Sequence, residues 1–280
     1  MRVVLACLAC TAACGFHSAA APVDATTADS PITVIDAPPI DASPIEPDAA
    51  PLARVSDGLI GLWTFSEAPG IAVTTTAADT SATGRPVPLK VSFGTVTYAD
   101  GNVTPDGVAV LASDPLPHLN ADVKRSAGVT LEAWVITSTD DQGTPAAPVV
   151  VAGLDASVVS RNISILQVGK RWVARVRTTA DKNGGPDLVS ATDVVANQLT
   201  HLVVVADAAQ RILYVDGEVS FADPVPGAPL GWDPAYRLVL GNELVRGRQW
   251  AGSFALVAMY QDALSKLQVD RNFTVGPDSP

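Results

Sequence analysis

The sequence predicts an all-β protein, built as a sandwich of two antiparallel sheets. The clearest support is Thr200–Ala222, THLVVVADAAQRILYVDGEVSFA. His201–Ala206 and Arg211–Val215 are apolar, β-branched runs typical of buried strands. Asp216-Gly217 then predicts a tight hairpin turn, because both central residues of a type I′ turn need positive φ. The composition agrees, since Val, Thr, Ala and Pro predominate and aromatic residues make up only 5%.

Further strands are expected on both sides of this meander, from alternating apolar patterns bounded by Gly, Pro and Asp. Pro115–Ser126 is expected to be a loop, and Ser265–Phe273 a short final helix. The expected strands lie at Gly58–Glu67, in short pieces within Val96–Leu111, and at Ala127–Thr137, Val149–Gly153, Ser164–Gly169, Arg171–Thr178, Asp187–Ala191, Glu218–Ala222, Arg237–Gly241 and Ser253–Tyr260.

The N-terminus predicts an exported, lipid-anchored protein. Residues 1–13, MRVVLACLACTAA, have one basic residue and a short apolar run, which is typical of a signal peptide. Thr11-Ala12-Ala13-Cys14 resembles a bacterial lipobox, so Cys14 is the expected lipid attachment site, with Cys10 as an alternative. An ordinary secreted protein cleaved near Ala21 is the other interpretation. Gly15 follows Cys14 instead of an acidic residue, which favours the outer membrane or cell surface over inner-membrane retention.

Residues 14–56 are expected to be a lipidated, disordered tether. The segment is rich in Pro, Asp and Ala and shows no apolar periodicity. Such a chain stays extended at about 3.1 Å per residue, so it would hold residues 57–280 away from the membrane.

Several motifs of residues 57–280 resemble laminin-G-like (LamG) domains of the concanavalin A-like class. The opening Gly58–Glu67 is similar to the family's Gly-Leu-x-Gly-x-Trp-x-Phe strand, and Ala127–Thr137 contains its T-x-E-A-W-V run. Leu213–Gly217 supplies L-Y-V-D-G, and Ser253–Ser265 resembles the closing strand and Ala-Leu-Ser turn. The resemblance implies a jelly-roll fold, which hosts lectins, adhesion modules, glycanases and domains without a ligand.

The net charge and the cysteine positions exclude further classes of function and of site. The formal net charge is −11, without the basic footprint of a nucleic-acid-binding protein. Cys7, Cys10 and Cys14 are the only cysteines, so neither a disulfide nor a cysteine metal site is expected downstream. LamG-like domains often hold calcium at an edge, but Ala255 replaces an acidic residue of the family, so no cofactor or metal is predicted, although calcium stays open. Loop acids available for such a site are Asp79, Asp140, Asp141, Asp181 and Asp187.

The sequence also predicts that the protein is not an enzyme. A retaining glucanase needs two carboxylates about 5.5 Å apart, which on one strand means positions i and i+2. Glu132 has no such partner, and Asp140 and Asp141 would face opposite ways on a strand. His201 is expected to be structural, and no serine nucleophile motif is present.

Five residues are candidates for ligand binding. Arg171, Arg175 and Arg177 alternate along one strand and would form a basic stripe. Trp232 and Trp250 lie in or beside loops, where exposed rings could stack on sugars; the alternative is that they fill the ends of the sandwich. The expected function is therefore a non-catalytic cell-envelope binding module for a glycan or an envelope or extracellular protein. A structural or adhesion spacer without a small ligand is the alternative, and a glycoside-active enzyme ranks third.

Overall fold

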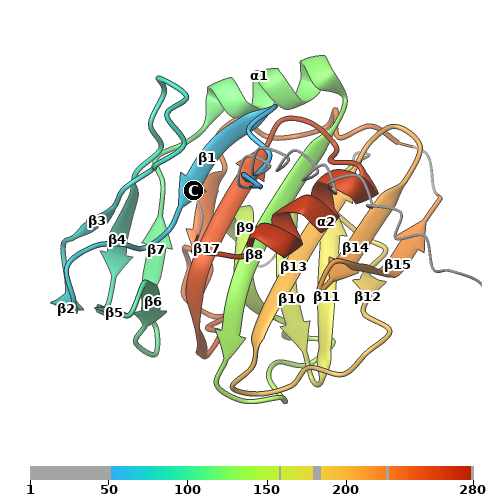
Figure 1. Ribbon diagram of the computed structural model, residues 1–280. Helices are drawn as coiled ribbons and strands as arrows, with labels where there is room; N and C mark the ends of the chain where they lie inside the picture. The colour runs from blue at the N-terminus through green and yellow to red at the C-terminus, as the bar shows by residue number, and fades with distance from the viewer. Residues whose placement is uncertain (1–51, 158, 179–183, 225–226, 279–280) are drawn as a thin grey trace, which may run out of the picture. The chain divides into compact units, whose positions relative to one another are not determined.

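The computed structural model describes residues 52–157, 159–178, 184–224 and 227–278. This part of the chain forms two antiparallel sheets that pack face to face (Figure 1). The predicted all-β sandwich with a jelly-roll fold is thereby confirmed. The expected signal peptide, and the expected tether up to residue 51, lie outside the described residues.

The first sheet has nine strands, in the order β15-β14-β13-β8-β17-β6-β5-β2, with β1 paired to β17. Its strands are β1 (Leu59–Trp63), β2 (Gly70–Ala72), β5 (Val96–Ala99), β6 (Asn102–Pro105), β8 (Val129–Thr137), β13 (Leu199–Ala206), β14 (Arg211–Val215), β15 (Glu218–Asp223) and β17 (Gly252–Tyr260).

The second sheet has eight strands, in the order β12-β11-β10-β9-β16-β7-β4-β3. Its strands are β3 (Thr76–Ala77), β4 (Leu89–Phe93), β7 (Val110–Ala112), β9 (Val149–Ser157), β10 (Ser160–Val168), β11 (Arg171–Val176), β12 (Leu188–Val189) and β16 (Arg237–Leu240).

The predicted meander is present as β13, β14 and β15. Its hairpin turn has φ of 51° at Asp216 and 79° at Gly217, the positive values that a type I′ turn requires. The Asp216 carboxylate also accepts a hydrogen bond of 2.8 Å from the His201 backbone N–H. The turn is therefore tied to the neighbouring strand as well as closing the hairpin.

The main core fills the space between the sheets. Its largest side chains come from both sheets and from the loops that close the sandwich. They include Trp63, Phe65, Trp172, Trp250 and Phe254, all almost completely buried. Burial of this size stabilises the domain without a disulfide, because an apolar side chain of this kind contributes about 1.5–3 kcal/mol when it leaves water.

Two helices flank the sandwich. α1 (Pro117–Ser126) replaces the loop predicted there; Pro117 stands in its first turn, where a missing N–H is tolerated, and Leu119 and Val123 face the core. α2 (Lys266–Val275) agrees with the predicted final helix and begins with a capping box of Ser265 and Gln268. In Figure 1, α2 lies across the outer face of the nine-stranded sheet.

The packed chain begins earlier than the sequence indicated. The tether was expected to extend to Ser56, yet Arg54 and Val55 are buried. The Val55 N–H donates a hydrogen bond of 2.9 Å to the side chain of Asn272 in α2. The expected boundary is therefore corrected for these residues, because their contacts come from the C-terminal helix and give no signal in the local sequence.

Candidate functional site

Two carboxylates from distant parts of the chain meet on the outer face of the eight-stranded sheet. Asp155 lies in β9, where its neighbour Leu154 faces the core, so Asp155 points to the opposite side. Its register partner across the sheet is Arg161 in β10. Glu243 lies in the loop between β16 and β17. All three side chains are buried, with at most 1% of their surface exposed. We call Asp155, Arg161 and Glu243 the carboxylate cluster.

The arginine lies between the two acids. Arg161 Nε is 3.4 Å from Asp155 Oδ2, and Arg161 Nη2 is 3.8 Å from Glu243 Oε2. Arg248 approaches the other oxygen of Glu243, with Nε 3.9 Å from Oε1. These separations are ion-pair distances that exceed the usual hydrogen-bond length. The arginines therefore offset part of the negative charge of the two acids without forming short hydrogen bonds to them.

The oxygens of both acids lack hydrogen bonds of normal geometry. Among the described residues, the donors nearest to these oxygens are Arg161 and the backbone N–H of Ser157 for Asp155, and the backbone N–H of Gly247 for Glu243, and none of these contacts has normal hydrogen-bond geometry. A buried polar group left in this state costs about 1–3 kcal/mol. Burial raises the pKa of Asp155 to about 7; the charge of Glu243 adds to this rise and that of Arg161 opposes it. Burial also raises the pKa of Glu243. The cluster can thus accept hydrogen bonds, and Asp155 can hold a proton near neutral pH.

Apolar side chains also pack together on the sheet that carries the cluster. They come from β7, β9, β10, β11 and β16 and form a second, smaller hydrophobic group. Its members are Val110, Ala112, Val150, Leu166, Val173 and Val239. Each of these residues is at most 2% exposed, so the group is part of the packed interior and not an open surface.

The three predicted arginines lie in or directly after β11, but each has different interaction partners. Arg175 is bound by Asp187 through two hydrogen bonds of 2.6 and 3.0 Å, and its charge lowers the pKa of Arg161, after the larger effect of burial. Arg171 forms an ion pair of 3.0 Å with Asp193. Arg177 donates its backbone N–H to β10. Arg175 is thus electrostatically coupled to the cluster, whereas the ligand-binding role of all three stays a prediction.

Trp232 and Trp250 are not exposed, so the prediction that their rings stack on sugars is wrong. Only 3% and 1% of their surfaces are accessible. The Trp232 indole N–H donates to the Arg177 carbonyl at 2.8 Å, and that of Trp250 donates to Gln167 Oε1 at 2.9 Å. Both rings fill the core, because burying a large ring gains more free energy than leaving it in a loop.

The predicted lipid attachment site, Cys14, and its alternative, Cys10, lie outside the described residues. Within the described ranges, no helix has both the length and the apolar character needed to cross a membrane. In the same part of the chain, no three His, Cys, Asp or Glu residues gather closely enough to hold a metal ion.

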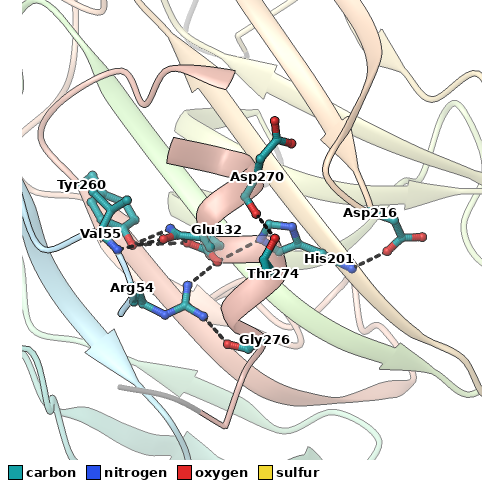
Figure 2. A network of polar contacts seen from close by, with 10 residues as sticks. Arg54, Val55, Glu132, His201, Asp216, Tyr260, Asp270, Thr274 and Gly276 are labelled. Atoms are coloured by element: carbon teal, nitrogen blue, oxygen red, sulfur yellow. Dashed lines mark hydrogen bonds and ion pairs between the residues drawn. The ribbon is translucent and has the colours of Figure 1, made fainter. Parts of the chain in front are cut away.

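A second buried polar network lies on the other sheet, beneath α2. Figure 2 shows Arg54 and His201 approaching Glu132 from opposite sides, at 2.5 and 2.9 Å from Oε1. Asn272 and Tyr260 donate to the other oxygen at 2.8 and 3.3 Å. Burial alone would raise the pKa of Glu132, but the hydrogen bond from His201 and the charge of Arg54 lower it to about 2.

The carboxylate of this second network is saturated by partners, unlike those of the carboxylate cluster. The network joins the chain entering the domain to the C-terminal helix, because Arg54 also donates to the Gly276 carbonyl at 2.6 Å. The His201 ring also stacks against Trp134 and Phe273, with ring centroids 4.5 and 5.7 Å away, and these two rings stack on each other at 5.8 Å. We interpret this network as structural, in agreement with the structural role expected for His201.

Sequence reasoning missed the carboxylate cluster. It searched for acids two residues apart on one strand, whereas Asp155 and Glu243 come from β9 and from the loop after β16. The one local signal is that Asp155 and Arg161 lie just outside the apolar strands expected at Val149–Gly153 and Ser164–Gly169, and β9 and β10 extend to include them. Charged residues inside such strands are rarely buried without a partner.

Two kinds of protein are among the solved structures to which this chain is similar. A Trypanosoma rangeli sialidase in complex with sialic acid matches with a TM-score of 0.55 and 19% identity, over 77% of this chain and 32% of that one. The binding domain of botulinum neurotoxin DC in complex with rat synaptotagmin II matches with a TM-score of 0.59 and 11% identity, over 79% of this chain and 52% of that one. The chain thus spans about a third of the sialidase. At these identities the likeness shows the fold alone.

These findings correct the prediction that the protein is not an enzyme. Chains containing this fold include sialidases, so the fold class gives no ground for excluding catalysis. The absence of two carboxylates on one strand does not exclude catalysis either, because Asp155 and Glu243, which come from different segments, both lie within ion-pair distance of Arg161.

Comparison with curated proteins finds no match. The family model for the concanavalin A-like lectin/glucanases superfamily matches residues 112–270, more than half of the chain. This range includes β8 to β11, the meander and the carboxylate cluster. The predicted LamG-like character of the domain is confirmed by this match. The chain therefore belongs to the concanavalin A-like lectin/glucanases superfamily.

Proposed function

We propose that the protein binds a glycan on the outer face of its eight-stranded sheet, at the carboxylate cluster. The observation that carries this proposal is the set of four buried oxygens on Asp155 and Glu243 that lack hydrogen bonds of normal geometry among the described residues. Sugar hydroxyls are hydrogen-bond donors and would supply the missing partners, removing a cost of about 1–3 kcal/mol for each group.

The charges of the cluster favour a neutral, hydroxyl-rich sugar over an acidic one. Two carboxyl groups face the site, and Arg161 and Arg248 already lie beside them. A further carboxylate from the ligand could not donate hydrogen bonds to the oxygens of Asp155 and Glu243, whereas the hydroxyl groups of a neutral sugar could. The sialic acid bound by the T. rangeli enzyme is therefore not the ligand that we expect here.

A protein partner is the second candidate, supported by an apolar edge of the sandwich. Val189 in β12 and Val219 and Phe221 in β15 are 40%, 49% and 39% exposed. Edge strands with exposed apolar side chains pair readily with other chains. The neurotoxin binding domain, in complex with synaptotagmin, shows that a protein of this fold can have a protein partner.

The proposal also places the protein in the cell envelope, exported and anchored by lipid at Cys14. The lipobox-like Thr11–Cys14 supports this assignment. Cys14→Ala should abolish metabolic labelling with a radioactive fatty acid, whereas the matched Cys10→Ala should leave it intact. Labelling that is lost with Cys10→Ala and kept with Cys14→Ala would reverse the assignment.

The binding function is tested with the full chain on an array of neutral and acidic glycans, with calcium and with EDTA. We expect saturable binding to neutral glycans, lost in Asp155→Asn and Glu243→Gln. Asp114→Asn is the matched control, since this carboxylate is exposed and pairs with Lys90. Analysis of the incubated glycans for released sugar reports any cleavage.

Binding that survives both cluster variants would refute the proposed site. No binding to any glycan would refute the glycan function and leave a protein partner or a spacer role. Binding lost with EDTA would show that a metal is needed.

A further inference from the structure

A four-residue segment between β16 and β17, Leu244–Gly247, lies over Glu243. A Cβ atom placed on Gly247 would be 3.3 Å from Glu243 Oε1, so this part of the backbone covers the carboxylate. Leu244 packs against the smaller hydrophobic group on the same sheet. The other side of the segment meets solvent, and Val245 is 56% exposed. The segment is therefore a thin cover over one half of the carboxylate cluster.

The two ends of this segment are firmly held. The buried Asn242 side chain accepts hydrogen bonds from the backbone N–H groups of Glu243 and Arg248, at 2.9 and 3.0 Å. Asn242 is itself joined to the Val108 carbonyl at 3.3 Å. This arrangement fixes the points at which the segment leaves and re-enters the sheet.

The middle of the segment is held more weakly. The Arg246 guanidinium lies over the ring of Phe93 in β4, 4.1 Å from its centroid. Phe93 is 42% exposed, and a cation–π contact at an exposed site is weak. Arg246 also has φ of 64°, a left-handed conformation that is unfavourable for a residue with a side chain. The Arg246 N–H also donates to the Glu243 carbonyl at 3.0 Å, a bond that closes a turn within the segment itself. The contact between the segment and β4 is thus weak, and the segment contains local strain.

We propose that Leu244–Gly247 is a flap that opens to admit a ligand to Asp155 and Glu243. Neither side chain has measurable exposure, so a ligand reaches them only if something moves. The flap is short and hinged at Asn242, and its middle is held by one exposed cation–π contact and by one backbone hydrogen bond, from the Arg246 N–H to the Glu243 carbonyl. Admission of a ligand rests on the proposed function, whereas opening of the flap does not require a ligand.

The test measures chemical access to the carboxylates without a ligand. The full chain is treated with a water-soluble carbodiimide and glycinamide, which convert accessible carboxyl groups into amides, and the modified peptides are followed by mass spectrometry. We expect slow modification of Glu243 in the native protein, accelerated about two- to fivefold by Phe93→Ala, the factor that corresponds to losing an exposed cation–π contact.

Two controls make the result decisive. Glu132 is buried under α2 and should stay unmodified, so it reports global unfolding. Phe273→Ala removes a ring of similar exposure (38%) in α2 and should leave the Glu243 rate unchanged. Equal rates for Glu243 and Glu132 in every variant would overturn the flap. Accelerated modification in Phe93→Ala without protection by any glycan would support the flap and count against the proposed function.

Discussion

Replacing Arg54 by alanine tests how the chain entering the domain is joined to its C-terminal helix. The native guanidinium contacts Glu132 at 2.5 Å and the Gly276 carbonyl at 2.6 Å. The substitution leaves a fully buried carboxylate without its cationic partner. Breaking a buried ion pair in this way costs about 3–5 kcal/mol. Because Glu132 keeps its contacts with His201, Asn272 and Tyr260, we expect the lower end, about 3 kcal/mol.

Urea denaturation at neutral pH, followed by tryptophan fluorescence, measures this loss. With urea m-values of about 1–3 kcal/mol/M, a loss of about 3 kcal/mol lowers the urea concentration at the unfolding midpoint by about 1 M or more. Arg271→Ala is the matched control: its Nε donates to the Ala53 carbonyl in an exposed contact, so its loss should cost less than about 1 kcal/mol. Adding Glu132→Gln to Arg54→Ala should restore at least about 1 kcal/mol by removing the buried charge. An Arg54→Ala protein within about 0.5 kcal/mol of the native free energy of unfolding would refute the reasoning.

Three further predictions concern the second sheet and the core. Between about pH 4 and pH 7 the folded protein holds a proton on Asp155 that the unfolded chain has lost, so the free energy of unfolding should fall by up to about 4 kcal/mol as pH rises through this window. Asp155→Asn should reduce this dependence on pH, and an unchanged dependence in denaturation experiments would show that another group causes it. Trp250→Phe should lower the free energy of unfolding by about 1–3 kcal/mol, because the hydrogen bond to Gln167 is lost, and should leave the glycan affinity of the folded protein unchanged. Weaker glycan binding at an equal folded fraction would show that Trp250 belongs to the binding site. Gly153→Ala should lower the free energy of unfolding by about 1–3 kcal/mol, because the new Cβ atom would lie 2.9 Å from the Cβ atom of Ser164 on the adjacent strand. An unchanged midpoint of thermal unfolding would show that the two strands can move apart at this position.

The sheets could be predicted from the sequence because strand patterns and turns are local signals. The meander shows this most clearly, since the apolar runs and Asp216-Gly217 specify strands, turn and pairing within one short stretch. α1 was missed because Pro115 and Pro117 resemble a loop, although proline is well tolerated in the first turn of a helix.

The candidate site could not be predicted, because it depends on contacts between distant segments. Asp155 and Glu243 meet only after β9 and β16 pair in the second sheet. Burial of Trp232 and Trp250 likewise depends on how the two sheets close around their rings, which loop position in the sequence does not reveal. Arg54 was assigned to the tether for the same reason, since its partners lie at Glu132 and Gly276.

The central claim is that a ligand binds at the carboxylate cluster, and hydrogen–deuterium exchange of the full chain tests it most directly. Exchange is compared with and without the best-binding neutral glycan from the array. We predict slower exchange in Val149–Ser157, Ser160–Val168 and residues 242–250, which carry the cluster and the flap. No change is predicted in α2, which lies on the other sheet. Protection confined to α2, or to the β12 and β15 edge, would contradict the account.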